Sequence, residues 1–168
     1  SRMAFQGKLI NVRVDTIKLA GNRLTEREIV EHAQCVCVVP LDEDGNVIMV
    51  QQYRNAAGLS LLEVPAGSVD DGELPAEAVV RELQEETGYS AVRIEHLATF
   101  WTCPGFCTEL MHAYLATGLI PGTMHPDEDE IIQVIKISQS EIPYMIRSGE
   151  ICDAKSIACL MLVLSSEK

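Results

Sequence analysis

The sequence predicts one domain of the α/β or α+β class, in which a sheet and helices pack in layers. The length of 168 residues is ordinary for a single domain. Hydrophobic residues make up 47% of the chain, which is enough to bury a core. Strand-like patterns come first, an amphipathic helix follows, and further strands lead to two helices at the end. This alternation indicates layered strands and helices rather than an all-helical bundle.

The first 34 residues are expected to form antiparallel strands. The stretch LINVRVDTIKL, residues 9–19, alternates apolar and polar side chains as a half-buried strand does. Gly21-Asn22 marks a turn, and EREIVEH resumes an extended pattern. These strands precede a core that we expect from about residue 35 to 164.

The core begins with a continuously apolar run, QCVCVVPL, which predicts a strand buried on both faces. DEDGN (42–46) predicts a turn into a second strand, VIMVQQY, so that the hairpin ends at Arg54. NAAGLSLL predicts a loop that leads to Glu63. Later strands are expected over VRIEHLATFWT, ELMHAYLATGL and IIQVIKI, and helices over SEIPYMIRSGE and DAKSIACLMLVLSSE, with Ser140 and Asp153 as their caps.

Composition excludes some classes of function. With 13 Lys+Arg against 25 Asp+Glu, the net charge of −12 disfavours nucleic-acid binding. The six cysteines form no C-x-x-C pair, which predicts free thiols rather than disulfides or a zinc site. The four histidines show no ligand spacing, so no metal role is assigned to them. No signal peptide or membrane-spanning run occurs, and a cytoplasmic protein without membrane contact is expected.

An acidic helix is predicted inside GSVDDGELPAEAVVRELQEETGY, residues 67–89. Pro75 suits its first turn and Gly88 the position just past its end, so the helix is expected over residues 75–86. At about 100° per residue, three carboxylates fall on one face, which borders the expected core face. The carboxylates are those of Glu82, Glu85 and Glu86, and the expected core face holds Ala76, Val79, Val80 and Leu83.

A solvated acidic helix, paired internally through Arg81, is the alternative explanation of this pattern. The preceding loop, residues 68–74, contributes further acidic side chains. Carboxylates clustered beside a core are costly unless a cation neutralises them. Oxygen ligands without Cys or His favour Mg²⁺ or Mn²⁺ over zinc, and Mg²⁺ tends to recruit substrate phosphates. The pattern therefore predicts a divalent-metal site for phosphate chemistry.

The spacing of these residues resembles the box of the Nudix hydrolases. Gly67 is followed after five residues by Glu73 and after seven more by Arg81-Glu82-Leu83-x-Glu85-Glu86-x-Gly88, which matches every fixed position. Tyr89 replaces the usual aliphatic residue. The resemblance implies the Nudix fold, an α/β/α sandwich with a central mixed sheet, over a single domain of residues 1–168.

The resemblance also implies roles within the box. Main metal ligands would come from two helix carboxylates, with a third close by and a backbone carbonyl in addition. An ion pair between arginine and glutamate would hold the loop and the helix in shape. The implied ion is Mg²⁺, with Mn²⁺ as the alternative. The implied ligands are Ala66, Glu82, Glu85 and Glu86, and the implied structural residues are Gly67, Glu73, Arg81 and Gly88.

Segments outside the box are similar to ADP-ribose pyrophosphatases. These are VVPLDEDGNVIMVQQYR, LLEVPAG and FWTCPGFCTE, in which Pro104 stands where these enzymes have a proline. The implied reaction is hydrolysis of ADP-ribose to AMP and ribose 5-phosphate. Other nucleotide sugars such as GDP-mannose, and oxidised nucleoside triphosphates, are alternative substrates. A non-catalytic ADP-ribose-binding regulator is a further alternative, disfavoured because every box acid is present.

Similar enzymes place a catalytic glutamate in the loop that here reads HPDEDE. Glu128 and Glu130 both fit, with Glu128 preferred, and Glu85 is a further catalytic candidate. Substrate contacts are implied for a second set of residues. For the charged residues of this set, a purely structural role is the alternative. A homodimer is expected, with two of these residues reaching adenine or ribose. The set comprises Arg54, Glu63, Pro104 and Gly105, with Arg27 and Glu28 as the residues that would act across the dimer.

Overall fold

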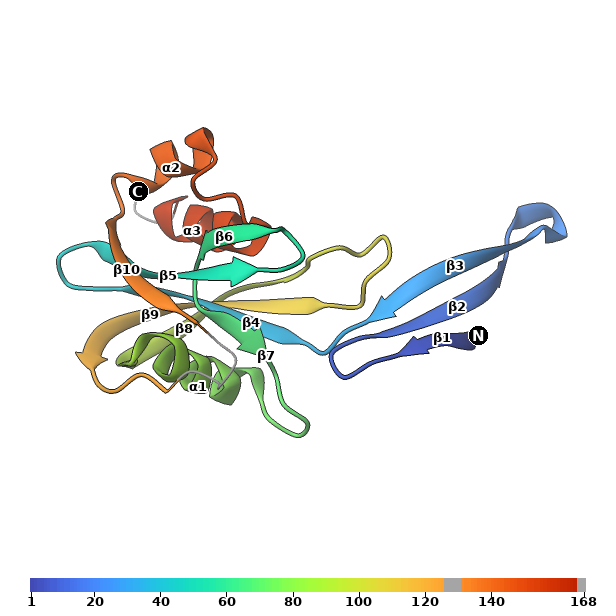
Figure 1. Ribbon diagram of the computed structural model, residues 1–168, viewed down its shortest axis with the longest axis horizontal. Coiled ribbons are helices and arrows are strands. Elements are labelled where there is room, and N and C mark those ends of the chain that lie inside the picture. The colour runs from blue at the N-terminus through green and yellow to red at the C-terminus, as the bar shows by residue number, and fades with distance from the viewer. Residues whose placement is uncertain (126–130, 166–168) are drawn as a thin grey trace.

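The central sheet is mixed and has seven strands in the computed structural model, which describes residues 1–125 and 131–165 (Figure 1). Its main path runs in the order β10-β5-β4-β9-β8, while β6 pairs with β5 and β7 with β4. The pairing of β4 with β9 is parallel and the others are antiparallel. The strands are β4 (Cys35–Leu41), β5 (Asn46–Arg54), β6 (Leu59–Glu63), β7 (Ala66–Ser68), β8 (Tyr89–Trp101), β9 (Leu110–Pro121) and β10 (Gln133–Ser138).

Helices cover both faces of this sheet (Figure 1). The first, α1 (Pro75–Thr87), lies on one face, and α2 (Ile142–Ser148) and α3 (Ala154–Ser165) lie on the other. In the middle strand β4, Val36 and Val38 pack on the α1 side, while Cys37 belongs to the cluster that includes α3 residues. A strand buried on both faces is apolar throughout, which explains the run in the sequence. The α/β/α sandwich predicted from the sequence is confirmed.

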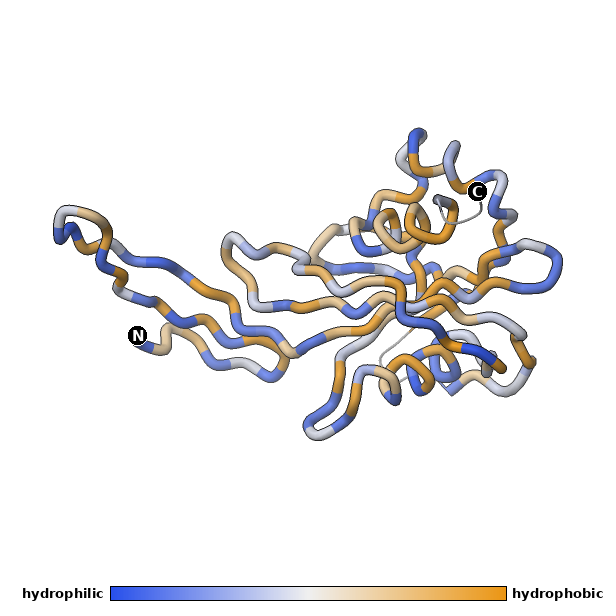
Figure 2. The backbone as a smooth tube through the Cα atoms, turned by 180° about the vertical axis from the view of Figure 1, so that it is seen from behind, coloured by the Kyte–Doolittle hydropathy of each residue, from blue (hydrophilic) through white to orange (hydrophobic). Residues whose placement is uncertain are grey.

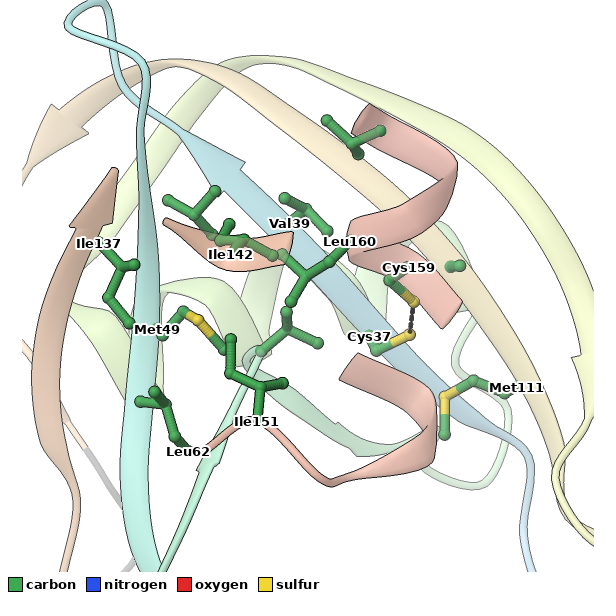
Figure 3. Close-up of a cluster of buried hydrophobic side chains, with 14 of the residues drawn as sticks. Cys37, Val39, Met49, Leu62, Met111, Ile137, Ile142, Ile151, Cys159 and Leu160 are labelled. Atoms are coloured by element: carbon green, nitrogen blue, oxygen red, sulfur yellow. Dashed lines mark hydrogen bonds between the residues drawn. The ribbon is translucent and has the colours of Figure 1, made fainter. Parts of the chain in front are cut away.

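The larger core cluster lies between the sheet and the two C-terminal helices. Figure 3 shows Met49 and Ile151 meeting Leu160 there, beside Cys37 and Cys159, whose Sγ atoms are 3.1 Å apart. All six cysteines are free thiols, as the sequence predicts. None of the helices in the described residues has both the length and the apolar character needed to cross a bilayer.

The N-terminal strands form a separate three-stranded antiparallel sheet that projects from the core (Figures 1 and 2). The sheet is joined to the loop before β9, since the Val30 backbone N–H donates to the Phe106 carbonyl and the Thr108 N–H donates to the Val30 carbonyl. The first of these strands is additional to the strands that the sequence predicts. The bounds are β1 (Arg2–Gln6), β2 (Asn11–Lys18) and β3 (Leu24–Glu31), with a 3-10 turn η1 (Ala20–Asn22).

Two local predictions are wrong. Residues 59–63 are not a loop but strand β6, because they pair with β5 over five successive residues. Ser140 does not cap α2, whose N-cap is Glu141, and the Ser140 hydroxyl instead lies 2.9 Å from that of Ser138. The other expected cap is present, since Asp153 Oδ2 accepts a hydrogen bond from the Ser156 backbone N–H at the start of α3.

Candidate active site

Helix α1 begins and ends where the sequence predicts to within a residue. Pro75 occupies its first turn, and the carboxylate of Glu77 accepts a hydrogen bond from the Leu74 backbone N–H, which satisfies a donor at the helix start. Gly88 ends the helix in the left-handed conformation, at φ 73°. These local signals set where the helix begins and ends.

The acids of α1 meet the backbone of β7. Glu86 Oε2 accepts a hydrogen bond from the Ala66 backbone N–H at 3.0 Å. At the next residue, Gly67, an added Cβ would overlap the carboxylate of Glu82. A glycine is therefore required for the strand and the helix carboxylate to approach this closely.

The buried face of α1 differs from the predicted one. Ala76 and Val80 were expected in the core, but both are exposed, Val80 to 47%. Glu86 is only 2% exposed and lies with the buried face instead. The hydrogen bond from β7 accounts for this, since a polar group can be buried when it has a partner. One residue of the acidic face, Glu86, is therefore buried with the core face rather than only bordering it.

Arg81 is the hub of the box. Its guanidinium donates to Glu73 through Nε and Nη2, at 3.0 and 2.9 Å, and Nη2 also donates to the Ser68 carbonyl. Nη1 lies 2.7 Å from Glu82 Oε1 and 3.0 Å from Glu85 Oε2. The hydrogen bond with Glu73, above all, raises the pKa of the guanidinium. Arg81 therefore ties the loop, the strand and the helix together.

The box holds more negative charge than Arg81 can neutralise. Four carboxylates adjoin this one guanidinium or the β7 backbone, so within the box the ionised acids outnumber Arg81 by three. The charge of Glu86 also acts on Arg54, outside the box. The donors are all oxygens, which suits a hard divalent cation such as Mg²⁺. The glycine beside Glu82 lets its carboxylate approach the backbone of β7. The donor chemistry of these residues therefore fits such an ion, although Arg81 now contacts the oxygens of Glu82 and Glu85. The four carboxylates are those of Glu73, Glu82, Glu85 and Glu86.

A cavity of about 900 Å³ opens beside this cluster. Backbone and side chains of β7 form part of its wall, so the cavity reaches the strand that contacts the box acids. Basic side chains, from Lys8, Arg54 and Lys155, form another part. The helix carboxylates of the box do not themselves line the cavity, and they adjoin it only through the β7 backbone. Basic side chains bind phosphate oxygens directly, so a diphosphate suits the basic wall.

A balanced charge network positions the basic wall. Arg54 donates to both oxygens of Glu63, at 3.0 and 2.7 Å, and Lys155 Nζ lies 2.7 Å from the same carboxylate and 3.0 Å from that of Asp153. Burial alone would raise the pKa of Glu63, but the hydrogen bonds and charges of Arg54 and Lys155 outweigh it and lower that pKa. Two cations and two carboxylates thus compensate each other.

The structure brings only some of the sequence-predicted substrate residues to this cavity. Arg54 lines it, while Glu63 lies behind Arg54 and is 1% exposed. Arg27 and Glu28 are exposed on β3 and do not line the cavity. The rest lie elsewhere: Pro104 lines a smaller hollow of about 240 Å³ beside Trp101, Gly105 is exposed, and Glu128 and Glu130 fall outside the described residues.

Sequence reasoning missed Lys8, Lys155 and Glu109, which also line the cavity. Lys155 stands two residues after Asp153 in the motif DAKS, and that spacing of opposite charges was the one available signal. Glu109 ends the segment FWTCPGFCTE, whose likeness to ADP-ribose pyrophosphatases was its signal, although no role was assigned to it. Lys8 carries no comparable signal, because it reaches the cavity only through the packing of the N-terminal segment.

A family model described as NUDIX domain matches residues 31–156 of the chain. This match covers most of the sequence and includes the whole box. The chain belongs to the NUDIX domain family.

Relatives agree with this membership. The ADP-ribose pyrophosphatase of Bacillus subtilis (strain 168) is 36% identical over 90% of this chain and 83% of the relative. The Methanol dehydrogenase activator of Bacillus methanolicus is 34% identical over 97% of this chain and 89% of the relative. A solved structure titled "Crystal structure of ADP compounds hydrolase" superposes with a TM-score of 0.88 at 22% identity, covering 98% of this chain and 89% of that one, which supports the fold.

Proposed function

We propose that this NUDIX-family protein is a Mg²⁺-dependent hydrolase that cleaves the diphosphate of ADP-ribose to AMP and ribose 5-phosphate. The observation that carries this proposal is the meeting of the box carboxylates with the β7 backbone beside a cavity whose other wall is basic. The choice of ADP-ribose is supported by relatives named ADP-ribose pyrophosphatase, at 36% identity, from Bacillus subtilis and Mycobacterium tuberculosis.

The acids of the box, which adjoin the cavity through the β7 backbone, would hold the metal. Glu82 and Glu86, together with the carbonyl of Ala66, would be the ligands, with Glu85 next to them. When bound, Mg²⁺ neutralises charge on the diphosphate and lowers the pKa of a coordinated water. Arg81 contributes by holding Glu82 and Glu85 near each other and fixing the loop through Glu73.

The basic side would hold the substrate. Arg54 presents a planar guanidinium to the cavity, and two such N–H donors match a pair of phosphate oxygens. Glu63 would act through Arg54, because its buried carboxylate fixes the guanidinium by two hydrogen bonds. Lys155 adds a second positive charge at the same wall and is itself anchored by Glu63 and Asp153.

A carboxylate would accept the proton of the attacking water. The water oxygen forms the new bond to phosphorus, the bridging oxygen leaves with the other phosphate, and the proton passes to the base. We place this base in the loop that follows β9, with Glu128 preferred over Glu130, and keep Glu85 as the alternative within the box. A base would need only a modest pKa for this step if a metal held by the box lowered the pKa of the water.

We also propose that the protein works as a homodimer through its N-terminal sheet. The sheet projects from the core and carries exposed apolar side chains, including Met3, Phe5 and Leu24 (Figure 1). Arg27 and Glu28 on β3 do not line the cavity of their own chain. In a dimer they would reach the nucleoside end of a substrate bound in the cavity of the other subunit. Sedimentation analysis of the intact chain tests this assembly.

Hydrolysis assays test the proposed activity. The purified protein with ADP-ribose and Mg²⁺ is expected to release AMP and ribose 5-phosphate in equal amounts, and chelation of the metal should stop the reaction. GDP-mannose belongs in the same panel, because relatives named GDP-mannose pyrophosphatase are 32% identical over 70% of this chain. Preference for GDP-mannose would reassign the substrate, and no cleavage of any nucleotide sugar would overturn the proposal.

A further inference from the structure

A second group of possible metal ligands stands at the cavity wall, apart from the acidic helix. His32, Cys35 and Glu109 each present one ligand atom, and these three atoms lie within 4.8 Å of one another. His32 Nδ1 is 3.7 Å from Cys35 Sγ and 4.0 Å from Glu109 Oε1. Within the part of the chain that the structure describes, it is the one group of three His, Cys or acidic side chains that converges in this way.

Three different segments position these ligands. His32 directly follows β3, Cys35 is the first residue of β4, and Glu109 directly precedes β9. The parallel pairing of β4 with β9 places Cys35 opposite Met111. The hydroxyl of Thr108 accepts a hydrogen bond from the His32 backbone N–H at 2.9 Å, which joins two of the segments. The convergence is therefore a product of the fold rather than of one flexible loop.

Neighbouring groups orient the ligands. The Thr102 hydroxyl donates to Glu109 Oε2 at 2.5 Å, which leaves Oε1 as the oxygen nearest His32. The Ser68 hydroxyl lies 3.8 Å from the sulfur of Cys35. Metal sites in proteins commonly have such outer partners, which fix the orientation of the ligands.

We infer that His32, Cys35 and Glu109 form a binding site for a transition-metal cation of the Zn²⁺ type, distinct from the Mg²⁺ site of the box. Nitrogen, sulfur and oxygen donors together favour zinc over magnesium, which prefers oxygen alone. In a tetrahedral zinc site, ligand atoms lie about 3.3 to 3.8 Å apart, as follows from bonds of about 2.0 to 2.3 Å. The observed 3.7 and 4.0 Å separations need only small side-chain rotations to reach this range.

Binding has two identifiable costs. The Cys35 thiol must release its proton to solvent as the cation takes its place. His32 Nδ1 lies 2.9 Å from the Ala33 carbonyl oxygen, and coordination through this nitrogen gives up that contact. We therefore expect affinity on the order of micromolar rather than the far tighter binding of closed structural zinc sites.

Occupation of this site would obstruct the cavity. All three ligands line the same cavity as Arg54 and Gly67, so a cation held there would lie at its wall. If the proposed hydrolysis takes place in this cavity, Zn²⁺ at low concentration inhibits it, and ADP-ribose protects against inhibition. The site thus gives the enzyme a means to respond to free zinc.

Calorimetric titration of Zn²⁺ into the protein, with Mg²⁺ in excess throughout, tests the site without any need for turnover. One Zn²⁺ per chain is expected to bind, and Cys35→Ser and His32→Gln should each weaken binding by at least about tenfold. The matched control is Cys103→Ser, which removes an exposed thiol from the same cavity wall and should leave zinc affinity unchanged. Co²⁺ should give a thiolate charge-transfer band that is lost in Cys35→Ser.

The outcomes separate this inference from the proposed hydrolysis. Zinc uptake that is kept in Glu86→Gln and lost in Cys35→Ser supports the site even if ADP-ribose is not cleaved. Zinc uptake that is lost in Glu86→Gln and kept in Cys35→Ser would assign the ion to the box and overturn the inference. The absence of zinc uptake by the parent protein would also overturn it. If Cys35→Ser does not fold, Glu109→Gln replaces it, because the amide keeps the size of the side chain but binds zinc weakly.

Discussion

One charged cluster lines the cavity and a second contacts the β7 strand of its wall, and the two differ in the balance of their charges. Around Arg81, several carboxylates share one guanidinium, whereas Arg54 and Lys155 face an equal number of carboxylates, Glu63 and Asp153. A balanced buried network can be satisfied within the protein. In an unbalanced network the like charges repel one another, and a bound cation reduces this repulsion. The difference supports the proposal that the cluster around Arg81 binds a cation, while in the other cluster the two carboxylates hold Arg54 and Lys155 in position for a substrate.

The largest expected effect comes from removing one charge of the unbalanced cluster. Glu86→Gln keeps an oxygen that can accept the hydrogen bond of the Ala66 N–H but loses the charge that would bind Mg²⁺. We expect ADP-ribose turnover to fall about 1000-fold while stability changes little, because metal chemistry depends on the ligand charge. Turnover and urea unfolding of the same preparation measure both quantities.

The matched control for this substitution is Glu77→Gln on the same helix. Glu77 is exposed and its carboxylate contacts the Leu74 N–H, so the change removes an acid without touching the box. Turnover should stay within about twofold of the parent, since surface substitutions of this kind have small effects. Equal losses in Glu77→Gln and Glu86→Gln would mean that the helix carboxylates act through general charge and that the two clusters do not differ as argued.

The balanced cluster should respond in the opposite way, with loss of stability. Lys155→Met leaves Glu63 and Asp153 as like charges in a nearly buried place, since the Lys155 side chain is 15% exposed. Removal of one partner of a buried network costs about 3 kcal/mol of unfolding free energy. Lys136→Met is the control, because its pair with Asp42 is more exposed and should contribute less than about 1 kcal/mol. Similar losses in both variants, from urea unfolding, would contradict the distinction.

The two clusters also differ in how far the sequence predicts them. The unbalanced cluster lies within one segment, so helical periodicity and spacing are sufficient to find it. The balanced cluster joins Glu63 to Lys155 across 92 positions, and only packing of α3 on the sheet brings them together. The same reason explains why the sequence shows no sign that His32 meets Glu109.

The fold itself was largely predictable because its signals are local. The apolar run of β4, the turn before β5 and the bounds of α1 follow from patterns of a few residues. Strand β6 was missed because LSLLE is short and is fixed by pairing with β5 rather than by its own alternation. The prediction that Ala76 and Val80 are buried in the core was wrong. A helical wheel assigns the buried face from apolar residues alone, so it does not predict that Glu86 is buried.

A smaller effect is expected at the contact between β7 and the box. In Gly67→Ala, the new methyl group would displace the carboxylate of Glu82, which is the end of a flexible side chain and can move at little cost. Unfolding free energy should therefore fall by about 1 kcal/mol or less. The Mg²⁺ concentration needed for half-maximal turnover should rise about tenfold, because the displaced carboxylate no longer lies where the ion would bind.

A double-mutant cycle isolates this effect. In a Glu82→Gln background the methyl group has no charged ligand to displace, so Gly67→Ala should change the Mg²⁺ requirement less than it does in the parent. Additive effects of the two substitutions would show that the glycine acts through the backbone instead.

The smallest expected effect is on stability in acid and is confined to the balanced cluster. Interactions with Arg54 and Lys155 hold the pKa of Glu63 below its ordinary value despite its burial. The pKa of Asp153 is also lowered, because the charge of Lys155 and the hydrogen bonds from Ser156 and Lys155 together outweigh burial. Groups with lowered pKa values contribute stability above about pH 4, the ordinary carboxyl range, and lose it as pH falls through the folded values. In Lys155→Met both carboxyls lose this cation, so the deficit in unfolding free energy relative to the parent should shrink as pH falls through the folded values, which urea unfolding at a series of pH values measures. A deficit that is the same at every pH would mean that Arg54 alone sets the ionisation of Glu63, and that the cluster is a pair with a lysine beside it rather than a four-membered network.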